Sequence, residues 1–240
     1  MGAGHPSRPA TAADHLEEAM SGNERRDEAG AAARHALVGP PDLWEMKRRF
    51  QIDFIRGAGL MPHHRLLDLG CGTLRGGIPL IEYLAPGHYA GVEVRREVLD
   101  EGRQEFAESG LAGKEPQLVH CSRLAELDLG RTFDVAWAFA VLIHMDDRIL
   151  DDAVAAVARH LTADGVLYAT ANVGAEPAGT WQGFPVVHRE AAFYANVFGR
   201  HGLVLKDLGS LESFGHVHPR LPVEAQARQR MLKATKAGAV

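Results

Sequence analysis

The chain is poor in cysteine, and it has no long run of basic or of apolar residues. Its two cysteines, Cys71 and Cys121, form no Cys-x-x-Cys pair, so zinc and redox motifs of that kind are not indicated. The net charge is −5 and no Lys/Arg cluster stands out, which argues against a nucleic-acid partner. No apolar segment approaches the roughly 20 residues that span a bilayer, and no secretory signal is seen. We expect a reduced, cytoplasmic protein that has no membrane partner.

What is present suits one sizeable domain preceded by a separate segment. The chain has 240 residues, of which 46% are hydrophobic. Residues 1–41 are rich in alanine, glycine, proline and charge, with short helices conceivable over 14–20 and 23–35. We expect this segment to be either a mobile tail or a lid that orders over a ligand, and residues 42–240 to form the domain.

From residue 42 onward, helical spacing alternates with short apolar segments. A helix is predicted to start at Pro40-Pro41-Asp42 and to end at Gly57 and Gly59. Strands are predicted over 65–69, 88–94, 117–120, 133–140, 166–171 and 203–208, and helices over 78–84, 97–109, 146–161 and 188–201. Residues 211–217 are expected to form an antiparallel edge strand, and residues 223–236 a terminal helix. This alternation predicts an α/β fold with a doubly wound, mostly parallel sheet and helices on both faces.

The most informative segment is Leu66-Leu67-Asp68-Leu69-Gly70-Cys71-Gly72, where a short strand runs into a glycine turn. Gly70 and Gly72 let the backbone approach a ligand at the carboxyl end of a strand, where open α/β sheets bind their ligands. A dinucleotide-binding turn would have its third glycine where Arg75 stands. Asp68, two positions before the first glycine, suits a cationic ligand better than a pyrophosphate.

Glu93 ends the next predicted strand. A carboxylate at that position can accept hydrogen bonds from both hydroxyls of a ribose. Together with the glycine turn, Glu93 therefore indicates a nucleoside ligand.

The segment from Asp68 to Gly72 resembles motif I of the class I S-adenosylmethionine (SAM)-dependent methyltransferases, and Glu93 resembles their ribose-binding acid. The resemblance covers about residues 43–210 and is closest to small, stand-alone bacterial members. It implies a seven-stranded Rossmann-like sheet with one antiparallel strand and a pocket for SAM, the co-substrate, along the strand ends. Asp68, Gly70, Cys71, Gly72 and Glu93 are the implied SAM-binding residues there.

The same resemblance extends the pocket to two further strand ends. Ser122 stands after the third strand, where the family commonly has an aspartate beside the adenine. Phe139 lies at the end of the fourth predicted strand, where the family's backbone passes the methionine part of SAM. The family's Asn/Asp-Pro-Pro-Tyr segment for amino methylation of nucleobases and glutamine is not found after that strand.

His144 also follows the fourth strand, and it is the predicted catalytic residue. Its ordinary pKa suits a general base at neutral pH. The alternative is a histidine that fixes the loop or caps the next helix. An acceptor pocket could be lined by residues nearer the C-terminus, namely Trp181, Phe184, His188, Phe214, His216 and His218. A metal is not expected, because no carboxylate joins His216 and His218 at a recognisable ligand spacing.

The predicted function is transfer of the methyl group of SAM to a small-molecule acceptor, an O or N nucleophile of a metabolite, natural product or sugar. Two alternatives remain open at this point. One is an NAD-dependent oxidoreductase of related fold, which Asp68 and Arg75 disfavour. The other is a non-catalytic nucleoside-binding scaffold.

Overall fold

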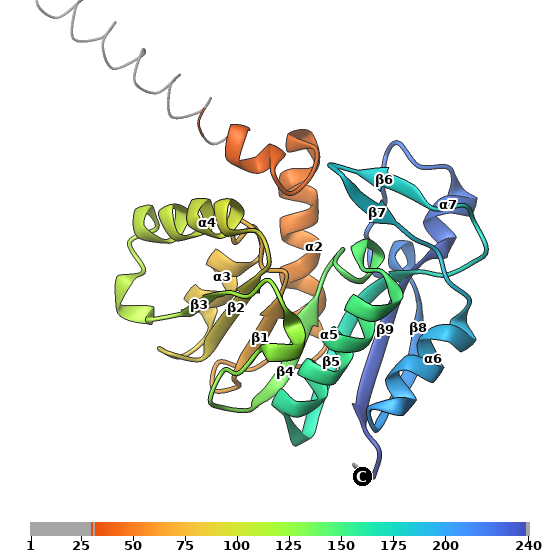
Figure 1. The fold of residues 1–240 in the computed structure, drawn as a ribbon. Coiled ribbons are helices and arrows are strands. Elements are labelled where there is room, and N and C mark those ends of the chain that lie inside the picture. The colour runs from red at the N-terminus through yellow and green to blue at the C-terminus, as the bar shows by residue number, and fades with distance from the viewer. Residues whose placement is uncertain (1–29, 31, 239–240) are drawn as a thin grey trace, which may run out of the picture.

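A computed structural model of the chain describes residue 30 and residues 32–238. Its centre is a seven-stranded sheet of order β3-β2-β1-β4-β5-β9-β8 (Figure 1). The strands are β1 (Leu66–Leu69), β2 (Tyr89–Glu93), β3 (Gln117–His120), β4 (Phe133–Ala138), β5 (Leu161–Asn172), β8 (Leu203–Ser210) and β9 (Gln229–Lys236). β9 runs antiparallel to β5 and β8, and the pairs among β1 to β5 are parallel. The expected sheet with one antiparallel strand is confirmed.

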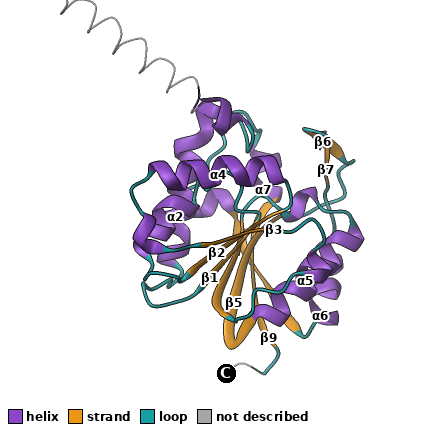
Figure 2. Ribbon diagram, turned by 60° about the vertical axis from the view of Figure 1, so that its left-hand side comes forward, coloured by secondary structure: helices purple, strands orange, loops and turns teal. Residues whose placement is uncertain are grey.

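Helices cover both faces of this sheet, as Figure 2 shows. One face packs against α2 (Trp44–Gly57), α3 (Gly77–Tyr83) and α4 (Arg96–Glu108), and the other against α5 (Asp147–His160) and α6 (Ala191–Arg200). Neighbouring strand residues alternate between the two cores: Leu66 belongs to the first and Leu67 to the second. The central strands β1, β2 and β4 are buried on both faces, which is why they appear as continuous apolar runs in the sequence.

The predicted helices and strands up to β8 agree with the observed ranges to within a few residues at their ends, except that β5 starts at Leu161, five residues earlier than predicted. β3 matches its predicted range, and α2 ends at Gly57 as expected. Asp146 caps the N-terminus of α5, because one of its carboxylate oxygens accepts a hydrogen bond from the Ile149 N–H at 2.7 Å. The helix proposed over 14–20 and most of that over 23–35 lie outside the described residues.

The predictions for the C-terminal region are wrong. Residues Leu211–Phe214 form a short 3-10 helix instead of an edge strand, and the helix α7 covers only Val223–Arg228. The segment that follows is β9, which is inserted between β5 and β8 and buries Met231, Leu232 and Ala234. Hydrogen bonding to a strand on each side, together with this burial, outweighs the helical tendency of the isolated segment.

A hairpin that the sequence pattern does not indicate lies beyond the main sheet. It consists of β6 (Gly179–Trp181) and β7 (Phe184–Val186), which form a separate two-stranded sheet. In Figure 1 it lies above the carboxyl ends of the parallel strands, beside the start of α2. Among the described residues, no helix has the length and apolar character needed to cross a membrane.

Candidate active site

The carboxyl ends of the parallel strands open into a cavity of about 650 Å³. This volume lies within the roughly 300–1,000 Å³ of ordinary ligand sites. Every site residue predicted above lines it: Asp68, Gly70, Cys71, Gly72, Glu93, Ser122, Phe139 and His144. Of the proposed acceptor wall, Trp181, Phe184, His216 and His218 line the cavity, whereas His188 and Phe214 do not.

The backbone conformation and the packing of the turn after β1 both require glycine at positions 70 and 72. Gly70 and Gly72 have φ values of +72° and +59°, which strain any residue with a side chain. A Cβ on Gly70 would overlap the Val141 side chain, and one on Gly72 would lie 2.8 Å from Val38 Cγ1. Glycine is therefore needed at both positions, as expected. The atoms that a Cβ would meet first belong to neighbouring side chains of the protein, so the reason for glycine is packing within the protein rather than the approach of a ligand.

Glu93 organises this turn from the end of β2. One carboxylate oxygen accepts the Gly72 N–H at 3.1 Å, and the other accepts the N–H groups of Val94 and Arg95 at 3.0 Å each. The side chain is buried, yet it lines the cavity. Carboxylate oxygens have several lone-pair sites, so these bonds leave capacity for a ligand.

Asp68 is a buried carboxyl group at the floor of the cavity. Burial raises its pKa to about 7, while the Tyr89 hydroxyl, which donates a hydrogen bond to it at 2.6 Å, opposes this rise. A cationic ligand group nearby would favour the ionised form. Its neighbour Cys71 packs in the apolar core, and burial raises the pKa of its thiol, so this side chain is unreactive.

Two more of the predicted site residues closely follow β3 and β4. Ser122 is exposed at the rim of the cavity. Phe139 is buried, and its ring is parallel to that of Trp137, with 5.9 Å between centroids. Ala140, the next residue, has a φ of +56° and donates its N–H to Thr170 Oγ1 at 2.7 Å. This bond holds the backbone in an unusual conformation, and both residues line the cavity.

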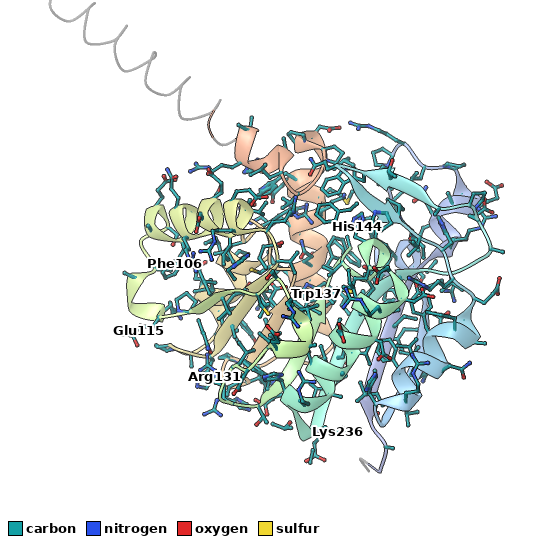
Figure 3. All side chains as sticks on the ribbon, viewed as in Figure 1. Phe106, Glu115, Arg131, Trp137, His144 and Lys236 are labelled. Atoms are coloured by element: carbon teal, nitrogen blue, oxygen red, sulfur yellow. The ribbon has the colours of Figure 1, made fainter. Side chains whose placement is uncertain are left out.

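His144 ends the short 3-10 helix Leu142–His144 and lies beneath the β6–β7 hairpin (Figure 3). Its Nδ1 is 2.8 Å from the Pro185 carbonyl oxygen, and its ring stacks on Trp181 with 5.3 Å between centroids. A carbonyl oxygen can only accept, so Nδ1 carries the hydrogen and the neutral ring has its lone pair on Nε2. Burial lowers the pKa of His144, and Arg95 and Lys47 lower it further. At neutral pH, His144 is therefore an uncharged imidazole able to accept a proton at Nε2.

The last residues before α2 cover the glycine turn. Val38, Gly39 and Pro40 line the cavity. Side chains from three separate loops donate hydrogen bonds to successive carbonyl groups of this segment: Gln182 to Ala36 at 2.9 Å, Arg95 to Leu37 at 3.2 Å and Arg75 to Val38 at 3.0 Å. These hydrogen bonds join residues 36–38 to the hairpin and to the loops that follow β1 and β2.

Two lining residues on α2, Lys47 and Gln51, are not among the sequence predictions. Their spacing of one helical turn places both on the same face, next to the apolar face of Phe50 and Phe54, and this is the signal that could have found them. Among the residues that the structure describes, no group of His, Cys, Asp or Glu is suited to hold a metal ion.

Comparison with known proteins agrees with this geometry. Residues 67–167 match a family model described as a methyltransferase domain. Among solved structures, the CcbJ methyltransferase from Streptomyces caelestis aligns with a TM-score of 0.62 at 18% identity, over 84% of this chain and 98% of that one. The search against curated proteins returned no match.

Two further structures show the same likeness. Magnesium protoporphyrin IX methyltransferase from Synechocystis PCC 6803, with bound SAM, has a TM-score of 0.60 at 18% identity, over 82% of this chain and 81% of that one. The glycopeptide N-methyltransferase MtfA has a TM-score of 0.60 at 13% identity, over 79% and 90%.

The sheet order, the glycine turn and these alignments define a class I methyltransferase fold. Residues 67–167 thus match a methyltransferase domain, and the chain shares the fold of these solved methyltransferases, as its resemblance to motif I led us to expect.

Proposed function

We propose that the protein transfers the methyl group of SAM to a nucleophilic oxygen or nitrogen atom of a small molecule bound in the same cavity. The observation that carries this proposal is the convergence of Glu93, Asp68 and His144 on one cavity at the strand ends. Glu93 would accept the ribose hydroxyls, and Asp68 would face the positively charged methionine end of the donor. Ser122 and Phe139 would complete the donor side.

The chemistry needs positioning above all. An in-line attack on the sulfonium methyl breaks the carbon–sulfur bond, forms the bond to the acceptor and leaves S-adenosylhomocysteine. Holding both partners in line contributes as much as about 7–11 kcal/mol to lowering the barrier. His144 Nε2 would take the proton that a hydroxyl or a protonated amine loses, because Nδ1 is engaged with Pro185.

Binding experiments test the donor assignment directly. Calorimetric titration should show saturable binding of SAM and of S-adenosylhomocysteine and none of NAD. Binding of NAD instead of SAM would refute the proposal. A panel of hydroxylated and amino compounds, with S-adenosylhomocysteine as the measured product, would then identify the acceptor.

We also propose that the segment before α2 is a lid rather than a tail, because its carbonyl groups accept hydrogen bonds from Arg75, Arg95 and Gln182. Deleting residues 1–39 should preserve SAM affinity but lower turnover, since the cavity would stay open to water. Deleting residues 1–29 alone is the matched control and should leave turnover near its normal value. Full turnover of the longer deletion would identify the segment as a plain tail.

A further inference from the structure

The wall of the cavity beneath the N-terminal segment carries several basic groups. Lys47, Arg75, His216 and His218 all line the cavity. Lys47 Nζ and Arg75 Nη1 approach a common point, because a Cβ built on Gly39 would lie 3.5 Å from the first and 3.7 Å from the second. The basic groups therefore gather in one part of the cavity.

This positive charge is poorly balanced within the described part of the chain. Lys47 makes no ion pair there, and Asp42, the acid that acts on it, is paired with Arg220. The acids that line the cavity are engaged elsewhere: Asp68 with Tyr89, Glu93 with backbone N–H groups and Asp152 with Arg148.

The effect of Lys47 on its neighbours shows where this charge acts. Burial, followed by Arg75, lowers the pKa of Lys47 to about 8, so the ammonium is mostly protonated at neutral pH. Lys47 in turn contributes to lowering the pKa values of His144, His216 and His218. Lys47 therefore acts on all three of these histidines, whereas Arg75 acts on His216 and interacts with Asp68.

His216 supplies a second, independent observation. Its side chain is only 4% exposed, and neither ring nitrogen has a hydrogen-bond partner among the described residues. The ring lies edge-on to Phe50 and Phe139, with centroid distances of 4.9 and 5.7 Å. A buried polar group without a partner is costly, and native proteins usually satisfy such groups. An oxygen atom of a ligand in the cavity would accept the His216 N–H.

We propose that the methyl acceptor carries a carboxylate group, which binds Lys47 and His216 while the acceptor's nucleophile faces His144. This inference rests on the proposed methyl transfer and adds the chemical class of the acceptor. The donor also has a carboxylate, in its methionine part, and we assign that group to Arg75, which follows the glycine turn and interacts with Asp68. Lys47 and His216 are left for the acceptor, beside the aromatic rings of Phe50 and Phe139.

Benzoate and its neutral analogue benzamide are suitable probes, and both are titrated into protein saturated with S-adenosylhomocysteine. We expect benzoate to bind saturably and benzamide more weakly. Lys47→Met should weaken benzoate binding by about 10- to 100-fold, the range for loss of a hydrogen bond between charged groups, and leave S-adenosylhomocysteine affinity unchanged. Lys47→Arg should retain benzoate binding, and Lys206→Met, which removes an exposed lysine away from the cavity, should behave as wild type.

Several results would overturn the proposal. They are absence of benzoate binding, equal binding of benzamide, or unchanged benzoate affinity in Lys47→Met. A loss of S-adenosylhomocysteine affinity in Lys47→Met would assign the subsite to the donor's carboxylate instead. If S-adenosylhomocysteine itself did not bind the wild-type protein, the proposed function would fail, and benzoate titration of the ligand-free protein would still test the anion subsite separately.

Discussion

Replacing His144 by asparagine and, separately, by glutamine distinguishes a general base from a residue that only holds the loop. An asparagine side-chain NH₂ can reach the position of imidazole Nδ1 and keep the hydrogen bond to the Pro185 carbonyl, which the structure shows at 2.8 Å. A glutamine side chain extends toward the position of Nε2 and gives up that bond. Neither amide can accept a proton at neutral pH, so neither variant can act as the base.

The expected magnitudes differ for the two roles. A general base contributes about 10²- to 10⁴-fold to kcat, which corresponds to about 3–5 kcal/mol of transition-state stabilisation. The Pro185 hydrogen bond is worth only about 1 kcal/mol of folding stability. We therefore expect both variants to lose kcat strongly while their SAM affinity stays normal, and only His144→Gln to lose thermal stability as well.

The pH dependence gives a second measurement. Burial lowers the pKa of His144 below its usual 6.5, so the wild-type rate should fall only as the pH decreases below that value, where the base becomes protonated. In both variants this acidic limb should be missing from the profile of kcat against pH. His63→Gln, which changes an exposed histidine away from the cavity, is the matched control. A His144→Asn enzyme with near-normal kcat and an unchanged profile would refute the base assignment.

Three other residues provide further tests. Glu93→Gln should weaken SAM binding by about 1.5–3 kcal/mol in calorimetry and also lower stability, because the carboxylate accepts three backbone N–H groups. The exposed Glu82→Gln should change neither quantity, and unaltered SAM affinity in Glu93→Gln would contradict the ribose assignment. Gly70→Ala should lower the free energy of unfolding, through overlap of the new Cβ with Val141 and through the positive φ at position 70. Adding Val141→Ala should recover the part due to overlap but not the roughly 1–2 kcal/mol due to positive φ. Purely additive effects of the two substitutions would contradict this account. His216 stays neutral in the folded protein down to about pH 4 but titrates near 6.5 when unfolded, so it should cost up to about 3 kcal/mol of stability as the pH falls through that interval. His216→Phe should reduce this loss of stability at acidic pH in denaturant titrations, and an identical loss in the variant would refute the burial argument.

Local sequence patterns predict the strands β1 to β4 well. Strands β1 to β4 are short apolar segments bounded by turns and charged helices, and each pairs with at least one strand about thirty residues or less away in the sequence. Their structure is therefore encoded within about thirty residues of sequence. β9 is different, because the residues that make it a strand lie in β5 and β8, and no local pattern records that pairing.

The sequence predicts several of the residues that line the cavity, and there is a physical reason for this. Parallel strands place their carboxyl ends at one edge, so Asp68, Glu93, Ser122, Phe139 and His144, each just before or after a strand end, are brought together without knowledge of any side-chain contact. Their chemical roles stay predictions that the binding and kinetic experiments test.

The sequence by itself thus determined the class of fold, the glycine turn and the edge of the sheet at which a ligand binds, because these depend on local periodicity and on a topological rule. Only the tertiary structure decided that Pro185 sets the tautomer of His144, that Val141 requires a glycine at position 70, and that Lys47 and His216 line the same cavity. Each of these contacts joins segments that lie far apart in the chain. Their geometry depends on how the hairpin, α2 and the C-terminal loops pack over the sheet, and the residues of one segment alone do not encode it.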